Sequence, residues 1–452
     1  MHTPRRKLLF GLPPDPTLPV AKLLCSYTKK GSNFSIYAVA LTISLFGLIT
    51  YVGDIKTMAL LSPWQRKPQE ISDAGLTQQP SEIAGANLTA EAVGVVPETC
   101  DLAHGEWVFD DVEYPLYQEE ECQYLSRQMS CLQNGRREAA YQKWRWQPAG
   151  CSLPKFDARL LLERLRGKRM LFVGDSINRN QWESLVCLIQ AVVPPEGRSR
   201  RVDGSRIIFT AKDYDASIEF YWAPFLVESN SDNPNFHSIA VRIIDADAIE
   251  KHAVHWKGAD VLVFDTYIWW MNTLEMRVLS RPGAKNWTDH DPILRYEAYE
   301  RVLGTLRNWL DRSVDPIKAS VFFMSMSPIH FESSFWGNAA GIKCAKETLP
   351  ITDMAGVVSG TDMKMFEVAK RVLGSPGRLV PVGFVDVTAM SERRKDAHTS
   401  VFTVRQGGRL LTPEQQARPG EFADCIHWCL PGLPDAWNQV LSAHLLAARR
   451  RR

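Results

Sequence analysis

Short apolar segments alternate with amphipathic segments from about residue 155 to the C-terminus. The apolar segments, which we predict to be strands, span 169–174, 217–228, 259–270, 320–328 and 379–388. The amphipathic segments, which we predict to be helices, span 161–167, 180–192, 293–313, 364–374 and 435–450. This alternation is typical of a parallel sheet covered by helices on both faces. We therefore predict an α/β fold whose functional residues lie at the carboxyl ends of the strands.

The hydrophobic pattern differs near the N-terminus, where residues 34–53 carry no charged side chain. This stretch is long enough to cross a bilayer as a helix; a buried helix of a soluble domain is the alternative. The run is too long and begins too far from Met1 for a cleaved signal peptide. Only one acid, Asp15, precedes it, against six basic residues: Arg5, Arg6, Lys7, Lys22, Lys29 and Lys30. By the positive-inside rule we predict a single-pass type II signal anchor.

This topology divides the chain into a cytosolic tail (1–33), the anchor (34–53) and a lumenal part. Residues 54–98 are rich in small and polar residues with little periodicity, which predicts a flexible stem. Residues 99–452 form the predicted catalytic domain: an aromatic-rich, cross-linked collar (99–154) and the α/β core (155–452). The net charge of +2 gives no indication of nucleic-acid binding.

The cysteines agree with a lumenal domain. Cys25 lies on the cytosolic side, and eight cysteines follow the anchor: Cys100, Cys122, Cys131, Cys151, Cys187, Cys344, Cys425 and Cys429. An even number in an oxidising compartment predicts four disulfides. A zinc site is the competing interpretation, but no Cys-x-x-Cys pair occurs. Two lumenal sequons begin at Asn87 and Asn286, which we expect to be glycosylated.

The tripeptide Gly174-Asp175-Ser176 lies where a predicted buried strand meets a predicted helix. A serine here gains help from the N–H groups of the helix N-terminus, which can also form an oxyanion hole. The alternative is that Ser176 is only the N-cap of the helix, a position that serine favours in any protein. On the tripeptide alone, the capping role is favoured.

A second motif supplies what a serine nucleophile needs. A nucleophilic serine requires a base, and the base requires a carboxylate that orients it. Asp424 and His427 are three residues apart, so in a loop or helical turn the carboxylate could hold one ring nitrogen and leave the other for Ser176. A purely structural histidine in a loop fixed by Cys425 and Cys429 is the alternative. Together, the two motifs favour catalysis.

Aromatic residues gather near the predicted strand ends, and most aromatic residues in any protein belong to the core. Aromatic faces with polar neighbours also suit sugar rings. We name as candidate substrate-binding residues Tyr267, Trp269, Trp270 and Trp336. His330 and His398 lie near strand ends or loops and receive no role.

The segments that contain the Gly-Asp-Ser and Asp-x-x-His motifs resemble a known family, the plant trichome-birefringence-like proteins. Four blocks carry the resemblance, "CDLAHGEWVFDDVEYPLY", "NGRREAAYQKWRWQPAGCSLPKF", "FVGDSINRNQWESLVC" and "ADCIHWCLPGLPDAWNQV", and they span about residues 99–447. Three further stretches, "YWAPFLVES", "DVLVFDTYIWWM" and "FFMSMSPIH", resemble most closely its xylan O-acetyltransferase branch, the type called ESKIMO-like.

The resemblance implies a Golgi enzyme with an SGNH-hydrolase-like three-layer sandwich that acetylates O-2 or O-3 of xylosyl residues. The family serine maps to Ser176, and its Asp-x-x-His pair maps to Asp424 and His427. An arginine after the serine maps to Arg179, which with Gly174 and Ser176 forms the expected oxyanion hole. The Asn-bearing block of many SGNH hydrolases is not visible, and "VFDTYIWW" occupies a comparable place.

The family's cysteine pattern implies the disulfides Cys100–Cys151 and Cys122–Cys187. It leaves four cysteines for the other two bonds, which we assign as Cys131–Cys425 and Cys344–Cys429.

The expected reaction is a double displacement without a metal or bound cofactor. Ser176 takes the acetyl group from a donor, acetyl-CoA or a derived compound, and a xylan hydroxyl then accepts it. The alternatives are an acetyl-polysaccharide esterase that uses the same triad, an acetyltransferase for mannan, xyloglucan or pectin, and a non-catalytic wall-polymer-binding protein.

Overall fold

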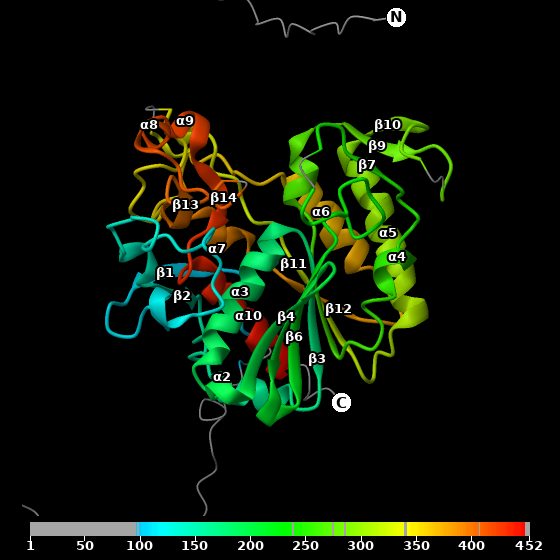
Figure 1. Cartoon of the computed structure of the whole chain (residues 1–452), viewed down its shortest axis with the longest axis horizontal. Helices are drawn as coiled ribbons and strands as arrows, with labels where there is room; N and C mark the ends of the chain where they lie inside the picture. The colour runs from blue at the N-terminus through cyan, green and yellow to red at the C-terminus, as the bar shows by residue number, and fades with distance from the viewer. Residues whose placement is uncertain are drawn as a thin grey trace, which may run out of the picture. The chain divides into compact units, whose positions relative to one another are not determined.

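A seven-stranded sheet forms the centre of the domain in the computed structural model (Figure 1). The strands follow the order β12 (Val382–Val385), β11 (Ser320–Met324), β8 (Val261–Asp265), β3 (Arg169–Gly174), β6 (Ala216–Trp222), β5 (Arg206–Ala211) and β4 (Arg198–Asp203). The five strands from β12 to β6 are parallel, and their side chains form most of the core.

The sheet is mixed, so the prediction of a fully parallel sheet was wrong at one edge. Strand β5 pairs antiparallel with β6, and β4 pairs antiparallel with β5. The sequence did not reveal β4 because five of its six residues are exposed and three are arginines. An edge strand with charged side chains has no apolar run to identify it, and such charges protect an open sheet edge.

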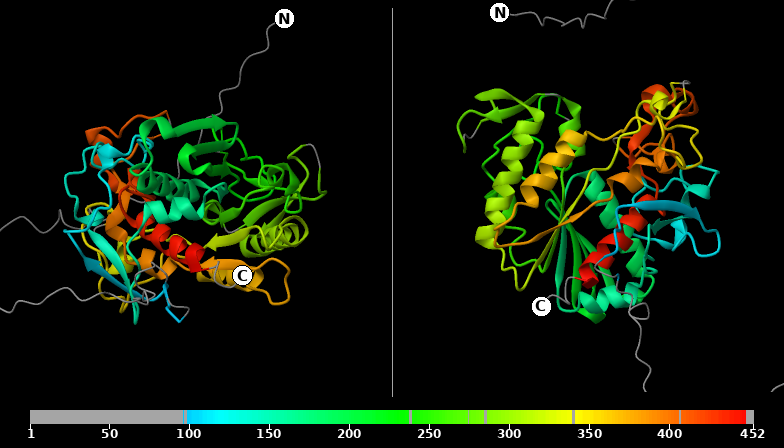
Figure 2. Two further views of the ribbon diagram at one scale, coloured as in Figure 1. Left: turned by 90° about the horizontal axis from the view of Figure 1, so that it is seen from below. Right: turned by 180° about the vertical axis from the view of Figure 1, so that it is seen from behind.

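Helices cover both faces of the sheet, as predicted (Figures 1 and 2). One face carries α2 (Ala158–Arg164), α3 (Ser176–Gln190) and α10 (Leu433–Ala447). The other carries α4 (Glu250–Ala253), α5 (Arg295–Ser313) and α6 (Met363–Leu373). Each expected helix of the core overlaps an observed helix; α2 and α3 begin three and four residues earlier than predicted, and α5 begins two residues later.

Smaller elements surround these layers. The collar contains an antiparallel pair, β1 (Gly105–Phe109) and β2 (Trp144–Pro148). A second small sheet contains β7 (Ile243–Ile244), β9 (Glu275–Leu279) and β10 (His290–Leu294), and a hairpin contains β13 (His398–Ser400) and β14 (Asp424–Trp428). The short helices are α7 (Thr388–Glu392), α8 (Pro413–Gln416), α9 (Pro419–Phe422) and 3₁₀ turns at Glu119–Glu121, Ala140–Gln142, Pro195–Gly197, Lys212–Tyr214, Ile268–Asn272, Ser333–Trp336 and Lys395–Ala397.

The structure describes residue 96 and residues 99–447, except 237–238, 274, 284–285, 339–340 and 406. The predicted tail, the anchor at 34–53, Asn87 and nearly all of the stem lie outside these residues. Within the described part, no helix has both the length and the hydropathy needed to span a bilayer. Asn286 of the second sequon is exposed.

Four disulfides form, and two of them differ from the predicted pairing. Cys100–Cys151 and Cys122–Cys187 are as expected. The other two are Cys131–Cys429 and Cys344–Cys425, so our assignment for these four cysteines was wrong. The reason is that Cys425 and Cys429 lie at opposite ends of one extended segment, β14 and the residue after it. Each end meets a different partner: the loop at Cys344 or the collar at Cys131.

Candidate active site

Ser176 is the first residue of α3, directly after the carboxyl end of β3. The N-cap is not Ser176 but Asp175, whose carboxylate accepts a hydrogen bond from the Ile177 N–H at 2.8 Å. Gly174 pairs with Asp265 of β8, and a Cβ atom at Gly174 would lie 2.0 Å from the Asp265 carbonyl oxygen. The close contact of the two strands therefore requires glycine, and Asp175 leaves the Ser176 hydroxyl free for another partner.

That partner is His427. The Ser176 Oγ and the His427 Nε2 are 2.8 Å apart, and the His427 Nδ1 lies 2.7 Å from the Asp424 Oδ2. The Asp424 Oδ1 accepts the N–H groups of Ile426 and His427, each at 3.1 Å. Both motif residues lie on strand β14 and not in the loop or helical turn that we expected. The three side chains have the hydrogen-bond pattern of a serine–histidine–aspartate triad.

The electrostatics of Asp424 suit an orienting carboxylate. Burial acts to raise its pKa, but the His427 ring and the hydrogen bonds from residues 426 and 427 outweigh that effect and lower the pKa below its ordinary value. The carboxylate therefore stays ionised at neutral pH and binds the ring through Nδ1, which leaves Nε2 to accept the serine proton.

Two further carboxyl groups lie behind Ser176 at the strand ends. Burial raises the pKa of Asp175, although the N–H groups of Ile177 and Tyr267 and the charge of His427 oppose this. Burial and the neighbouring Asp175 carboxyl raise the pKa of Asp265 well above its usual value. Two carboxyl groups this close in a buried place do not both ionise easily.

Side chains from other elements hold β14 in place, and the sequence did not indicate them. The Asn180 amide oxygen accepts the Trp428 N–H at 2.8 Å, and its NH₂ group donates to the Trp428 carbonyl oxygen at 3.2 Å. Asn180 lies one helical turn after Ser176, so this spacing could have suggested that both face β14. The Trp428 indole N–H donates to Ser327 at 2.9 Å.

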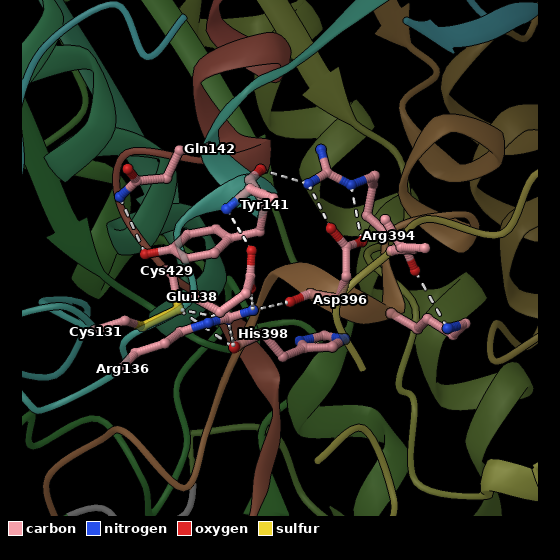
Figure 3. A network of polar contacts seen from close by, with 12 residues as sticks. Cys131, Arg136, Glu138, Tyr141, Gln142, Arg394, Asp396, His398 and Cys429 are labelled. Atoms are coloured by element: carbon pink, nitrogen blue, oxygen red, sulfur yellow. Dashed lines mark hydrogen bonds and ion pairs between the residues drawn. A yellow bond between two sulfur atoms is a disulfide. The ribbon is translucent and has the colours of Figure 1, made fainter. Parts of the chain in front are cut away.

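A network of polar contacts joins the collar to β13 (Figure 3). The buried Arg136 guanidinium donates to the carbonyl oxygens of Asp396 (2.7 Å) and His398 (3.2 Å), and pairs with Glu138. Arg394 binds the Asp396 carboxylate through two nitrogens and donates to the Tyr141 carbonyl oxygen at 2.6 Å. The Cys131–Cys429 disulfide lies beside this network.

Arg179 lies on α3 with its guanidinium between Gln128 and Glu183. These contacts tie it to the collar and to the next turn of its own helix. Its expected role at the oxyanion stays a prediction.

Three of the four candidate substrate-binding residues are core residues. Tyr267, Trp269 and Trp270 are buried, and the Trp270 indole donates to Thr266 at 2.8 Å. A ring packed by protein on both faces cannot stack on a sugar, so the structure accounts for these residues by core packing. Trp336 is half-buried and donates to Glu347 at 2.9 Å. Among the described residues, no group of three or more His, Cys, Asp or Glu side chains could hold a metal ion.

Family comparisons agree with this architecture. The model described as the GDSL/SGNH-like acyl-esterase family found in Pmr5 and Cas1p (PC-Esterase) matches residues 153–444. The PMR5 N-terminal domain matches residues 98–152, which correspond to the collar. The fold and the serine–histidine–aspartate geometry thus place the protein in the GDSL/SGNH-like acyl-esterase class.

Individual relatives narrow this class. Xylan O-acetyltransferase 2 of Oryza sativa subsp. japonica is 57% identical over 372 residues, which is 81% of this chain and 72% of the relative. Xylan O-acetyltransferase 3 of the same species is 55% identical over 78% of this chain and 77% of the relative. Protein trichome birefringence-like 3 of Arabidopsis thaliana is 46% identical over 77% of this chain and 80% of the relative. The chain belongs to the trichome-birefringence-like family.

Proposed function

We propose that this protein is a xylan O-acetyltransferase that works through an acetylated Ser176. The observation that carries the proposal is the continuous chain of hydrogen bonds from Ser176 through His427 to Asp424. The names of relatives that are 55–57% identical over most of the chain support xylan as the acceptor.

The reaction has two displacements. In the first, His427 Nε2 takes the Ser176 proton while Oγ attacks the acetyl carbonyl of the donor; His427 then gives this proton to the leaving group. In the second, His427 takes a proton from O-2 or O-3 of a xylosyl residue, and this oxygen attacks the acetyl-serine. Ser176 leaves as the alcohol after it regains the proton. Asp424 stabilises the imidazolium in both steps.

The oxyanion of each tetrahedral intermediate needs donors near Ser176. One donor is the backbone N–H of Ser176, at the N-terminus of α3, which follows the close contact of Gly174 with β8. Arg179 is a second donor. A single donor of this kind is worth about 3–4 kcal/mol. Trp336 remains the candidate for stacking on the sugar, since its ring is partly exposed.

Other features of the chain support a proposal for its location. We infer that residues 34–53 anchor the protein in the Golgi membrane in type II orientation, that the domain is lumenal, and that Asn87 and Asn286 carry glycans. Four disulfides support an oxidising compartment. The acetyl donor is acetyl-CoA or a compound derived from it, and it acts as a co-substrate.

The test is acetyl transfer to xylohexaose by the purified full chain. With acetyl-CoA or 4-methylumbelliferyl acetate as donor, mass spectrometry counts the acetyl groups on each oligosaccharide. We expect a gain with the wild type and with the surface control Ser334→Ala, and none with Ser176→Ala, whose melting temperature should be unchanged. Transfer by a folded Ser176→Ala variant would contradict the assignment of the nucleophile.

An esterase is the second candidate, because the matching family is described as acyl-esterases. It would use the same three residues with water as the acceptor. Loss of acetyl groups from a pre-acetylated xylohexaose, with no gain on the unmodified one, would favour the esterase.

A further inference from the structure

A buried pair of histidines lies directly behind the base and is not part of the triad. His330 follows β11, and His398 begins β13. The His330 Nδ1 and the His398 Nε2 are 2.7 Å apart, and the His398 Nδ1 lies 3.1 Å from the backbone carbonyl oxygen of His427. Both side chains are buried. The pair therefore touches the backbone of the residue whose ring contacts Ser176.

The contact falls in an irregular part of the hairpin. His398 pairs with Trp428, and Ser400 pairs with Asp424, so two steps along β13 correspond to four along β14. The extra residues of β14 form a bulge, a device that re-aims side chains near functional sites. Backbone groups of a bulge need new partners. Asp424 accepts the N–H groups of Ile426 and His427, and the His398 ring meets the His427 carbonyl.

We propose that His398 is a positioning residue for the base: its Nδ1–H donates to the His427 carbonyl and fixes the bulge from which the His427 ring reaches Ser176. The proposal adds a residue to the site of the proposed acetyltransferase, and it rests on that function. The His398 ring is itself held, because it stacks on Trp428 with ring centroids 3.7 Å apart. Arg136 binds the carbonyl oxygen of His398 and fixes the start of the strand (Figure 3).

The proposal fixes the direction of the hydrogen bonds through the two histidines. A carbonyl oxygen can only accept, so the His398 Nδ1 carries a proton. In a neutral ring the His398 Nε2 then accepts, and the donor must be the His330 Nδ1–H. The His330 Nε2 faces the Glu392 carbonyl oxygen at 3.2 Å. The three contacts need three protons and two neutral rings carry two, so this assignment leaves the longest contact, from the His330 Nε2 to the Glu392 carbonyl oxygen, without a proton.

The surroundings favour these neutral forms at neutral pH. Burial lowers the pKa of both histidines, and for His398 the charge of His330 acts in the same direction. The charged groups that face His330 are Glu392, Asp396 and Lys395. Those that face His398 are His330, Asp424 and His427, with Arg136 on its carbonyl oxygen. A neutral His398 keeps a second positive charge away from the imidazolium that forms on His427 during the reaction.

Two substitutions of His398 separate the donor from the bulk of the ring. The Asn side chain places its NH₂ near the position of Nδ1, and Gln places it near Nε2. We expect His398→Asn to keep most of kcat for acetyl transfer and His398→Gln to lose kcat about 10- to 100-fold, since small misplacements of a catalytic group cost this much. The KM for xylohexaose should change little in both. The matched control is His104→Asn, because His104 is an exposed histidine.

The rate of Ser176 labelling by diisopropyl fluorophosphate is the second readout. This labelling needs an activated serine and no xylan, so it tests the role of His398 even if the wild type does not acetylate xylan. A wild type that is labelled but does not acetylate xylan would overturn only the proposed function. Equal losses in folded His398→Asn and His398→Gln variants, or full labelling of His398→Gln, would overturn the positioning role. Selective ¹⁵N-histidine NMR of the unmodified full chain requires no substitution, and a neutral His398 that carries its proton on Nε2 at pH 7 would also overturn the positioning role.

Discussion

At the residue scale, Asp175 and Ser176 have separate roles: one caps the helix and the other contacts the base. Asp175 caps α3, and Ser176 is thereby left to meet His427. Asp424 likewise uses one oxygen for the His427 ring and the other for two backbone N–H groups. These hydrogen bonds hold the Ser176, His427 and Asp424 side chains in position before substrate binds.

The depressed pKa of the buried histidines predicts a loss of stability in acid. The unfolded histidine has a pKa near 6.5, so below this pH the unfolded state binds a proton that the folded state resists, and the free energy of unfolding falls as pH falls. Each such histidine costs up to about 1.4 kcal/mol per pH unit. Asp175, Asp265 and Asp435, whose pKa values are raised, act in the opposite direction.

A comparison of variants isolates the histidine contribution. We expect the wild type to lose stability relative to His330→Asn as the pH is lowered from 6.5 to 4.5, measured by urea denaturation. Taking the difference cancels the carboxyl groups that both proteins share. A difference that stays flat across this range would contradict the buried neutral state of His330.

The sequence predicted the three residues of the triad but not the residues around them. Ser176, Asp424 and His427 occur in short motifs, so local spacing reveals them. Asn180, His330 and His398 act through contacts between segments that are far apart, such as Asn180 with Trp428 across 248 positions. For the same reason an aromatic residue at a strand end, such as Trp270, cannot be assigned to the core or to a sugar from the sequence.

At the element scale, β14 is a short strand fixed at both ends. Cys344–Cys425 fixes its beginning, and Cys131–Cys429 fixes the residue after it. His427 lies between these two bonds, and Asp424 directly precedes the first of them. Among the described residues, β14 pairs with the three-residue β13 alone, so the disulfides replace the support that a wide sheet would give.

This arrangement predicts that disulfides differ in their effect on activity. Replacing Cys344 and Cys425 with serine should lower acetyl transfer at least tenfold at temperatures where the variant is folded, because β14 shifts. The pair Cys100→Ser and Cys151→Ser should lower the melting temperature, since a lost native disulfide costs about 2–5 kcal/mol, with little change in kcat. Both are measured by transfer to xylohexaose and calorimetry. Equal kcat values for the two double variants would contradict the role of β14.

The predicted strands β3 and β8 differ in burial from the missed strands β4 and β14. Strands β3 and β8 lie inside the parallel part of the sheet, are buried on both faces and appear as apolar runs. Strand β4 is exposed, and β14 is held by disulfides and side chains, so neither has a hydrophobic pattern of its own. The disulfide partner of Cys425 and that of Cys429 also depend on the extended form of β14, which the sequence did not show.

At the scale of the whole domain, the collar is part of the catalytic unit. Two of its cysteines bond to the core at Cys187 and Cys429, and Arg136 reaches the backbone of β13. The two family models that match the chain thus describe parts that share disulfides and a buried polar network.

We expect Arg136→Gln to destabilise the domain by about 2–3 kcal/mol, because hydrogen bonds from a buried charged group to backbone oxygens are lost. It should also lower kcat, since β13 loses its fixed start. Arg145→Gln is the control, because Arg145 forms a more exposed ion pair with Asp110; its effect should be much smaller. Both are measured by urea denaturation and transfer assays. Equal stability losses in the two variants would contradict a larger contribution of Arg136 to the stability of the domain.

The separation of the catalytic residues along the chain has a consequence for biosynthesis. Ser176 and His427 are 251 positions apart, and the bond that fixes the end of β14 spans 298 positions. The sheet strands up to β12 can be translated and begin to fold before His427 has left the ribosome. A nascent chain that lacks β14 therefore has no assembled triad, and the contact between Ser176 and His427 can form only once β14 has been translated and has folded beside α3.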